Sequence, residues 1–139
     1  MKKTNRRKFI GTAAALCAAT AAAAVPLPAI TVNRTMVHHV FFWLRNPTAT
    51  ADRDQLIAGL QTLGDIDTVK ALHIGIVADT APRDVVDNTW SVSELIFFDD
   101  VAGQATYQTH PIHLAFIEKY SHLWNKVVVY DAQTIQKQL

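Results

Sequence analysis

The stretch FFDDVAGQATYQTHPIHLAF, residues 97–116, combines the end of a strand, a helix start and a proline break. Asp99 or Asp100 can cap a helix over residues 101–107, because an Asp side chain accepts hydrogen bonds from the free N–H groups of a first turn. Pro111 suits the first position of a second helix, where its missing N–H leaves no bond unmade. The stretch therefore predicts a strand followed by two short helices.

Three side chains of this stretch can exchange protons, namely Tyr107, His110 and His113. If Pro111 is the first residue of its helix, His113 lies in the first turn, where the helix dipole and free N–H groups disfavour an imidazolium. A neutral imidazole beside a phenol is suited to general base chemistry at neutral pH. The alternative is that both histidines are half-buried packing and capping groups.

In the chain as a whole, the sequence predicts four strands, rich in β-branched and aromatic residues, over residues 35–45, 69–77, 90–98 and 124–130. Residues 52–63 predict a helix, because apolar residues recur there at helical spacing. The order strand, helix, strand, strand, helix, strand is that of the ferredoxin-like split β-α-β plan. We therefore expect an α+β fold with an antiparallel sheet and helices on one face.

The first predicted strand is apolar on both of its alternating faces. His38 and Phe42 share one face, whereas His39, Phe41 and Trp43 share the other, so at most one of the two histidines can join a given site. Helices on one side of the sheet leave the other face as an exposed apolar patch, which usually marks an interface. The pattern predicts a homodimer that pairs sheet against sheet.

Residues 1–29 predict an export signal, with five basic residues followed by an uncharged, alanine-rich segment. The segment NRRKFI, residues 5–10, resembles a twin-arginine signal. Cleavage near Ala24 or Ala29 would leave one domain over residues 30–139, periplasmic or secreted and without stable membrane association. The alternative is an uncleaved anchor, because about twenty uncharged residues can span a bilayer.

The composition of residues 30–139 excludes several classes of function. Eight basic residues stand against 12 acidic ones, so no basic surface is left for nucleic acid. The single cysteine, Cys17, lies in the predicted leader, so disulfide and thiol chemistry are excluded from the domain. With no phosphate loop, nucleotide fingerprint or compact ligand set, we expect no cofactor and no metal.

Glu94 stands among apolar neighbours in the third predicted strand. It either faces solvent, pairs with a basic side chain such as Lys126, or is an acid in a pocket. The last alternative applies if the side chain is buried, because burying an unpaired carboxylate costs so much free energy that it implies a function.

Three segments together resemble the stress-responsive dimeric α/β-barrel (Dabb) family: HHVFFWLR at 38–45, the stretch at 97–116, and LWNKVVVYD at 123–131. The similarity covers roughly residues 36–131. It implies a ferredoxin-like protomer whose sheet pairs with a second sheet into a dimeric α/β barrel. Many members of the family have no established activity, so the resemblance implies the fold more strongly than the function.

One branch of that family comprises polyketide cyclases, which use a tyrosine and a histidine for an aldol-type ring closure. The resemblance implies that Tyr107 and His113 match this catalytic pair, and that His38 and Trp124 match pocket residues.

The third strand departs from the cyclase pattern. Val92 stands where the cyclase has a pocket histidine, and Glu94 stands where it has a valine. A carboxylate in an apolar pocket changes both the charge and the pKa values there, so a shared polyketide substrate is not expected.

We therefore expect an exported, homodimeric Dabb domain that binds a small apolar or carbonyl-bearing molecule in a pocket of each protomer. The residues expected to contact this ligand are His38, Glu94, His110 and Trp124. One alternative is a cofactor-independent lyase, cyclase or isomerase with His113 as the base and Tyr107 as the acid. A second alternative is a non-catalytic dimeric scaffold, which predicts no cavity.

Overall fold

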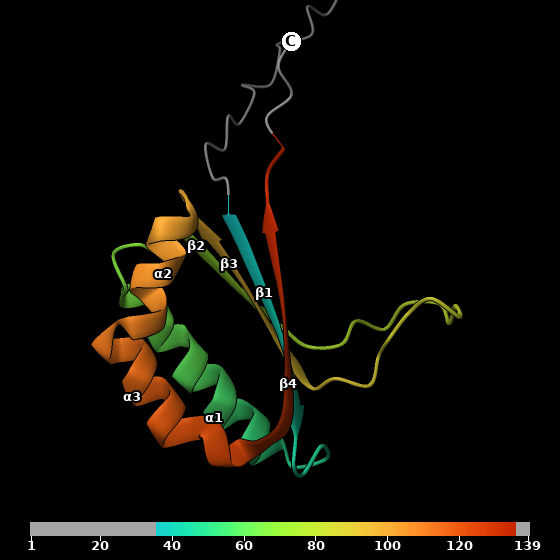
Figure 1. Ribbon diagram of the computed structural model, residues 1–139. Helices are drawn as coiled ribbons and strands as arrows, with labels where there is room; N and C mark the ends of the chain where they lie inside the picture. The colour runs from blue at the N-terminus through green and yellow to red at the C-terminus, as the bar shows by residue number, and fades with distance from the viewer. Residues whose placement is uncertain (1–35, 136–139) are drawn as a thin grey trace, which may run out of the picture. The chain divides into compact units, whose positions relative to one another are not determined.

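The computed structural model describes residues 36–135, and the predicted export signal over residues 1–29 lies outside them. The described residues form a four-stranded antiparallel sheet with helices on one face (Figure 1). The strands, in the spatial order β2-β3-β1-β4, are β1 (Met36–Leu44), β2 (Ala71–Gly75), β3 (Val92–Phe98) and β4 (Trp124–Gln133). The helices are α1 (Thr50–Gln61), α2 (Val101–Thr109) and α3 (Pro111–Tyr120), with 3₁₀ turns η1 (Thr62–Asp65) and η2 (Ser121–Leu123). The predicted ferredoxin-like α+β fold is confirmed.

The two edge strands differ in length from the prediction. β2 is shorter than predicted, because it pairs with β3 only from Ala71 to Gly75. β4 is longer, because it pairs with β1 along the whole of that strand and reaches Gln133 opposite Met36. Cross-strand pairing, which depends on the neighbouring strand, therefore sets these boundaries.

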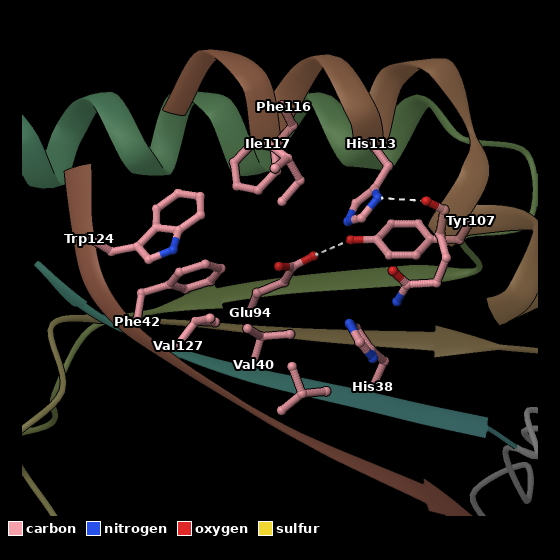
Figure 2. A pocket seen from close by; sticks show the side chains of 12 residues that line it. His38, Val40, Phe42, Glu94, Tyr107, His113, Phe116, Ile117, Trp124 and Val127 are labelled. Atoms are coloured by element: carbon pink, nitrogen blue, oxygen red, sulfur yellow. Dashed lines mark hydrogen bonds between the residues drawn. The ribbon is translucent and has the colours of Figure 1, made fainter. Parts of the chain in front are cut away.

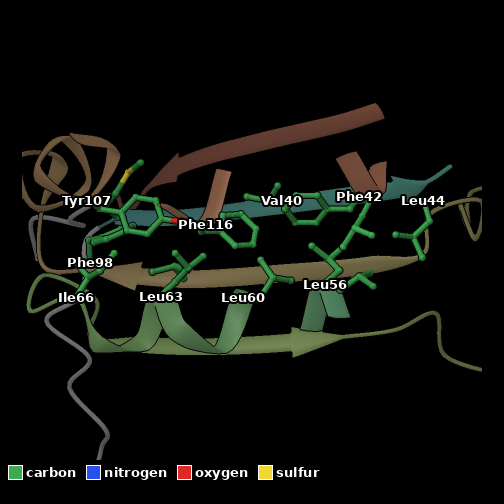
Figure 3. Close-up of a cluster of buried hydrophobic side chains, with 14 residues drawn as sticks. Val40, Phe42, Leu44, Leu56, Leu60, Leu63, Ile66, Phe98, Tyr107 and Phe116 are labelled. Carbon is green, nitrogen blue, oxygen red and sulfur yellow. The ribbon is translucent and has the colours of Figure 1, made fainter. Parts of the chain in front are cut away.

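The core lies between the helices and one face of the sheet. β1 alternates buried and partly buried residues along its whole length, as its two-faced pattern predicts. Phe42 on the inner face meets apolar side chains from α1 and α3, including Leu56, Leu60 and Phe116 (Figure 3). Burial of one such side chain contributes about 1.5–3 kcal/mol.

A sharp break separates α2 from α3. Asp100 caps α2 by accepting a hydrogen bond from the backbone N–H of Gly103 at 2.7 Å. His110 is extended, with φ −66° and ψ 138°, and Pro111 begins α3 as predicted. The chain therefore turns between the two helices, so that residues on either side of Pro111 can face one another.

The outer face of the sheet is aromatic, and none of the helices within residues 36–135 covers it (Figure 1). The Phe41 ring lies 4.2 Å from that of His39, 5.2 Å from that of Trp90 and 6.0 Å from that of Tyr130, measured between centroids. Tyr130 is 63% exposed. The apolar patch predicted from β1 is therefore present on the protomer.

Between residues 36 and 135, none of the helices is both long enough and apolar enough to cross a bilayer.

Candidate functional site

A cavity of about 180 Å³ lies between the inner face of the sheet and the α2–α3 pair (Figure 2). Its walls come from five elements that pack together only in the folded chain: β1, β3 and β4 below, and the two helices above. The lining residues are His38, Val40, Phe42, Glu94, Tyr107, Gln108, His113, Phe116, Ile117, Trp124, Val127 and Val129. Ile117, on α3, keeps 39% of its surface exposed.

Tyr107 and His113 face one another across the helix break. Their ring centroids are 4.5 Å apart, although six residues separate them in the chain. His113 Nδ1 lies 3.0 Å from the backbone carbonyl of Gln108. A carbonyl only accepts, so Nδ1 donates, and Nε2 is left pointing into the cavity (Figure 2).

The pKa of His113 is lowered, which keeps its ring neutral at pH 7. Burial is the main cause, and the charge of a protonated His38 adds to it, whereas the hydrogen bond to Gln108 acts in the opposite direction. The sequence predicted the direction of this shift from the helix N-terminus, but desolvation is the larger cause. A neutral ring with an unprotonated Nε2 can accept a proton from a ligand.

Glu94 is buried in the cavity wall, with 1% of its surface exposed. Its Oε1 accepts a hydrogen bond from the Tyr107 hydroxyl at 3.2 Å. The suggested pairing with Lys126 is wrong, because Lys126 Nζ lies 4.0 Å from the centroid of the Trp43 ring, a side chain of the outer face. Of the three alternatives for Glu94, the structure shows the pocket acid.

The Glu94–Tyr107 contact shifts the pKa of both groups. Burial raises the pKa of Glu94 to about 7, although the hydrogen bond from Tyr107 partly opposes this. Burial also raises the pKa of Tyr107, and the negative charge of Glu94 raises it further. Tyr107 therefore stays a phenol, while Glu94 can gain or lose a proton near neutral pH.

His38 also lines the cavity beside Tyr107, and the centroids of the two rings are 5.7 Å apart. Its Nδ1 lies 2.6 Å from Oδ1 of Asp131. Because a carboxylate only accepts, Nδ1 donates and Nε2 remains for a ligand.

Asp131 is a residue that the sequence reasoning missed. It lies directly opposite His38 in the β1–β4 register. The signal was an acidic residue directly after the last predicted strand, but its partner follows only from the strand pairing.

The other end of the cavity is aromatic. Trp124 lies 5.0 Å from Phe42 and 5.8 Å from Phe116 between ring centroids. We call these three residues the aromatic end, and His38, Tyr107 and His113 the polar end. Glu94 lies between the two ends (Figure 2).

His110, expected to contact a ligand, does not line the cavity. Its Nδ1 accepts a hydrogen bond from the backbone N–H of Ile112 at 3.2 Å, which caps α3. The ring is held by its own helix start, because the first N–H groups of a helix need acceptors. The structure thus brings together five of the six predicted site residues and leaves His110 outside the group.

Among the residues that the structure describes, no three His, Cys, Asp or Glu side chains gather in a way that could hold a metal ion. The side chains that line the cavity can transfer protons, form hydrogen bonds and make aromatic contacts.

The chain belongs to the stress responsive A/B barrel domain (Dabb) family, whose model matches residues 36–134. A stress-response A/B barrel domain-containing protein from Arabidopsis thaliana is 27% identical over 79 residues, which are 56% of this chain and 69% of that protein. The family predicted from the three sequence segments is confirmed.

Solved structures share the fold at low sequence identity. A hydroxynitrile lyase from Passiflora edulis has a TM-score of 0.61 and 20% identity, over 77% of this chain and 99% of that one. A Dabb family protein from Mesorhizobium loti has a TM-score of 0.60 and 18% identity, over 73% and 98%. A dimeric ferredoxin-like protein of unknown function from Thermobifida fusca has a TM-score of 0.58 and 19% identity, over 73% and 92%.

Proposed function

We propose that each protomer binds a small molecule with an apolar body and a carbonyl group in the cavity between the sheet and the α2–α3 pair. The observation that carries the proposal is the two-ended lining, in which an aromatic end faces a polar end of two histidines and a tyrosine. Ligand sites are typically apolar with a few convergent polar groups. The Tyr107 hydroxyl would turn from Glu94 to donate its one hydrogen bond to the carbonyl oxygen, and the apolar body would lie against Trp124.

A second candidate function is cofactor-independent lyase, cyclase or isomerase chemistry, favoured by the unprotonated Nε2 of His113 beside Tyr107. Nε2 would take a proton from the carbon next to a carbonyl. The C–H electron pair would then form the enolate, whose oxygen accepts a hydrogen bond from the Tyr107 hydroxyl. A hydroxynitrile lyase shares the fold, which supports the idea that this fold can host lyase chemistry.

The two functions are separated by the variant His113→Ala, with His122→Ala as a matched control outside the cavity. Binding of benzaldehyde is measured by NMR titration, and turnover is screened with cyanohydrins and β-diketones. If the protein is an enzyme, His113→Ala loses at least about 100-fold in turnover, the usual scale of a general base, while benzaldehyde still binds.

Binding by the wild type without turnover of any screened compound supports the binding function alone. If the wild type neither binds nor converts any of these compounds, the proposal fails, and a dimeric scaffold becomes the better interpretation.

We also propose that the protein is exported to the periplasm or secreted as a folded homodimer. Export is supported by the resemblance of residues 5–10 to a twin-arginine signal. Replacing Arg6 and Arg7 together by Lys is expected to keep the protein in the cytoplasm, as cell fractionation would show. An unchanged distribution of the double variant would contradict this route.

The homodimer is supported by the aromatic outer face, in which Phe41 contacts three other aromatic rings. It is also supported by solved relatives of the same fold that are described as dimeric.

A further inference from the structure

Glu94 is a buried carboxyl group with no Lys or Arg partner among residues 36–135. In the part of the chain that the structure describes, its hydrogen-bond donor is the neutral hydroxyl of Tyr107. The described residues that line the cavity include no Lys or Arg. The ion pairs within residues 36–135 are His38–Asp131, Arg53–Asp54 and Lys70–Asp99, so Glu94 takes part in none of them.

The histidines of the cavity do not supply the missing charge. His38 is paired with Asp131 through Nδ1, and burial lowers the pKa of His113 so that its ring is neutral at pH 7. An ionised carboxylate in such a place is costly unless a positive charge lies close to it. The unmatched group is therefore complementary to a cationic ligand.

The aromatic end offers a second feature that attracts cations. The rings of Phe42, Phe116 and Trp124 line the same cavity as Glu94. The negative face of an aromatic ring attracts an ammonium group, most strongly for Trp and in a desolvated place. Residues 30–139 also carry an excess of acidic over basic residues, which favours the approach of cations.

We infer that the ligand of this cavity is a small aromatic or apolar amine in its protonated form, with the ammonium group between Glu94 and the aromatic end. This rests on the proposed function, because it requires the cavity to take a small molecule. It goes further by naming the charge that the molecule carries. Glu94 then selects for amines, and Tyr107 holds the Glu94 carboxylate in place.

The test compares three probes of nearly equal size: benzylamine, benzyl alcohol and benzaldehyde. Their dissociation constants are measured by NMR titration or calorimetry at about pH 8, where Glu94 is ionised and the amine is protonated. We expect the wild type to bind benzylamine at least about tenfold more tightly than benzyl alcohol. Glu94→Gln, which keeps the side-chain shape and an acceptor for Tyr107, should remove this preference while leaving the affinity for benzyl alcohol nearly unchanged.

The inference is overturned if the wild type binds the amine no better than the alcohol, or if the Glu94→Gln variant keeps the preference. Benzaldehyde binding without an amine preference would leave the proposed function standing while the inference fails. No binding of any of the three probes would contradict both.

The pH dependence of the wild type gives a second, independent readout should Glu94→Gln fail to fold. Lowering the pH from about 8 to about 5.5 protonates Glu94, so the affinity for benzylamine should fall about tenfold or more while that for benzyl alcohol stays flat. The other titratable groups at the cavity are His38, Tyr107, His113 and, behind His38, Asp131. Protonation of His113 would also repel a cation, and the His113→Gln variant, which removes this contribution, should retain most of the fall in affinity. Loss of the fall in that variant would contradict the role of Glu94.

Discussion

At the scale of single residues, the most consequential side chain is Glu94. It occupies a position in β3 whose inner-face neighbours, Val92 and Ile96, are fully buried and apolar. Removal from water disfavours its charged form, and the pKa rises from 4.5 to about 7. One acidic residue in an apolar strand therefore both weakens the fold at neutral pH and places a titrating group in the cavity.

The stability of the fold should fall as the pH rises from about 4.5 to about 7. In this range the unfolded chain releases the Glu94 proton more readily than the folded chain, so the free energy of unfolding decreases with pH. The full destabilisation, on the order of 3 kcal/mol, is present above about pH 7 and vanishes below about pH 4.5.

Glu94→Gln should accordingly raise the free energy of unfolding at about pH 8 by up to this amount and leave it almost unchanged near pH 4.5. Urea denaturation of both proteins at the two pH values measures the difference. Glu118→Gln, an exposed position on α3, is the control and should show no comparable pH-dependent gain. An equal gain for Glu94→Gln at both pH values would show that the effect does not come from ionisation.

At the scale of elements, the approach of α1 to α3 depends on a glycine. The Tyr120 ring packs over Gly59, and a Cβ added there would lie 2.7 Å from two ring carbons and 2.9 Å from Cγ. Since Cγ is near the backbone, the ring cannot simply swing aside. This contact sets the position of α3, and through α3 the position of His113 above the sheet.

Gly59→Ala should therefore destabilise the protein by about 1–3 kcal/mol, although alanine is the better helix former. Gly64→Ala is the matched control in η1, where an added Cβ would lie at an ordinary 3.6 Å from Leu72. We expect the control to be neutral or slightly stabilising, as thermal melts of both variants would show. Equal melting temperatures for the two variants would mean that α3 shifts without cost.

At the scale of the whole molecule, the described helices α1, α2 and α3 cover one face of the sheet and leave the other face uncovered. Tyr130 of β4 is largely exposed beside Phe41, and Lys126 lies over the Trp43 ring on the same face. A second copy of the chain would bury this surface and remove apolar contacts from water. The face that does not form the cavity is thus the one that we expect to hold the dimer together.

Tyr130→Glu should convert the dimer to a monomer while the protomer stays folded, because the Tyr130 side chain contributes little to the protomer core. Light scattering coupled to size exclusion gives the mass, and circular dichroism checks the fold. The control is Leu114→Glu, which changes a comparably exposed apolar side chain on the opposite, helical side. A dimer that survives Tyr130→Glu and dissociates with Leu114→Glu would place the interface on the helices.

Much of this architecture could be predicted because it depends on local patterns. The Asp100 cap, the start of α3 at Pro111 and the two faces of β1 each follow from a few neighbouring residues. Capping was one of the two alternatives predicted for His110. Its closeness to His113 in the chain also predicted that it contacts a small-molecule ligand. In the folded protein the His110 ring does not contact the cavity, because it accepts a hydrogen bond from the first turn of α3.

The sequence by itself determined the order of elements, the side of β1 on which each residue lies, and the residue types that can transfer protons. These follow from periodicity, capping and proline geometry, which act within a few residues along the chain. Only the tertiary structure decided that Asp131 meets His38 and that Glu94 meets Tyr107. Such pairs depend on strand register and on the packing of α2 over the sheet, and these come from contacts between distant segments that no local pattern encodes.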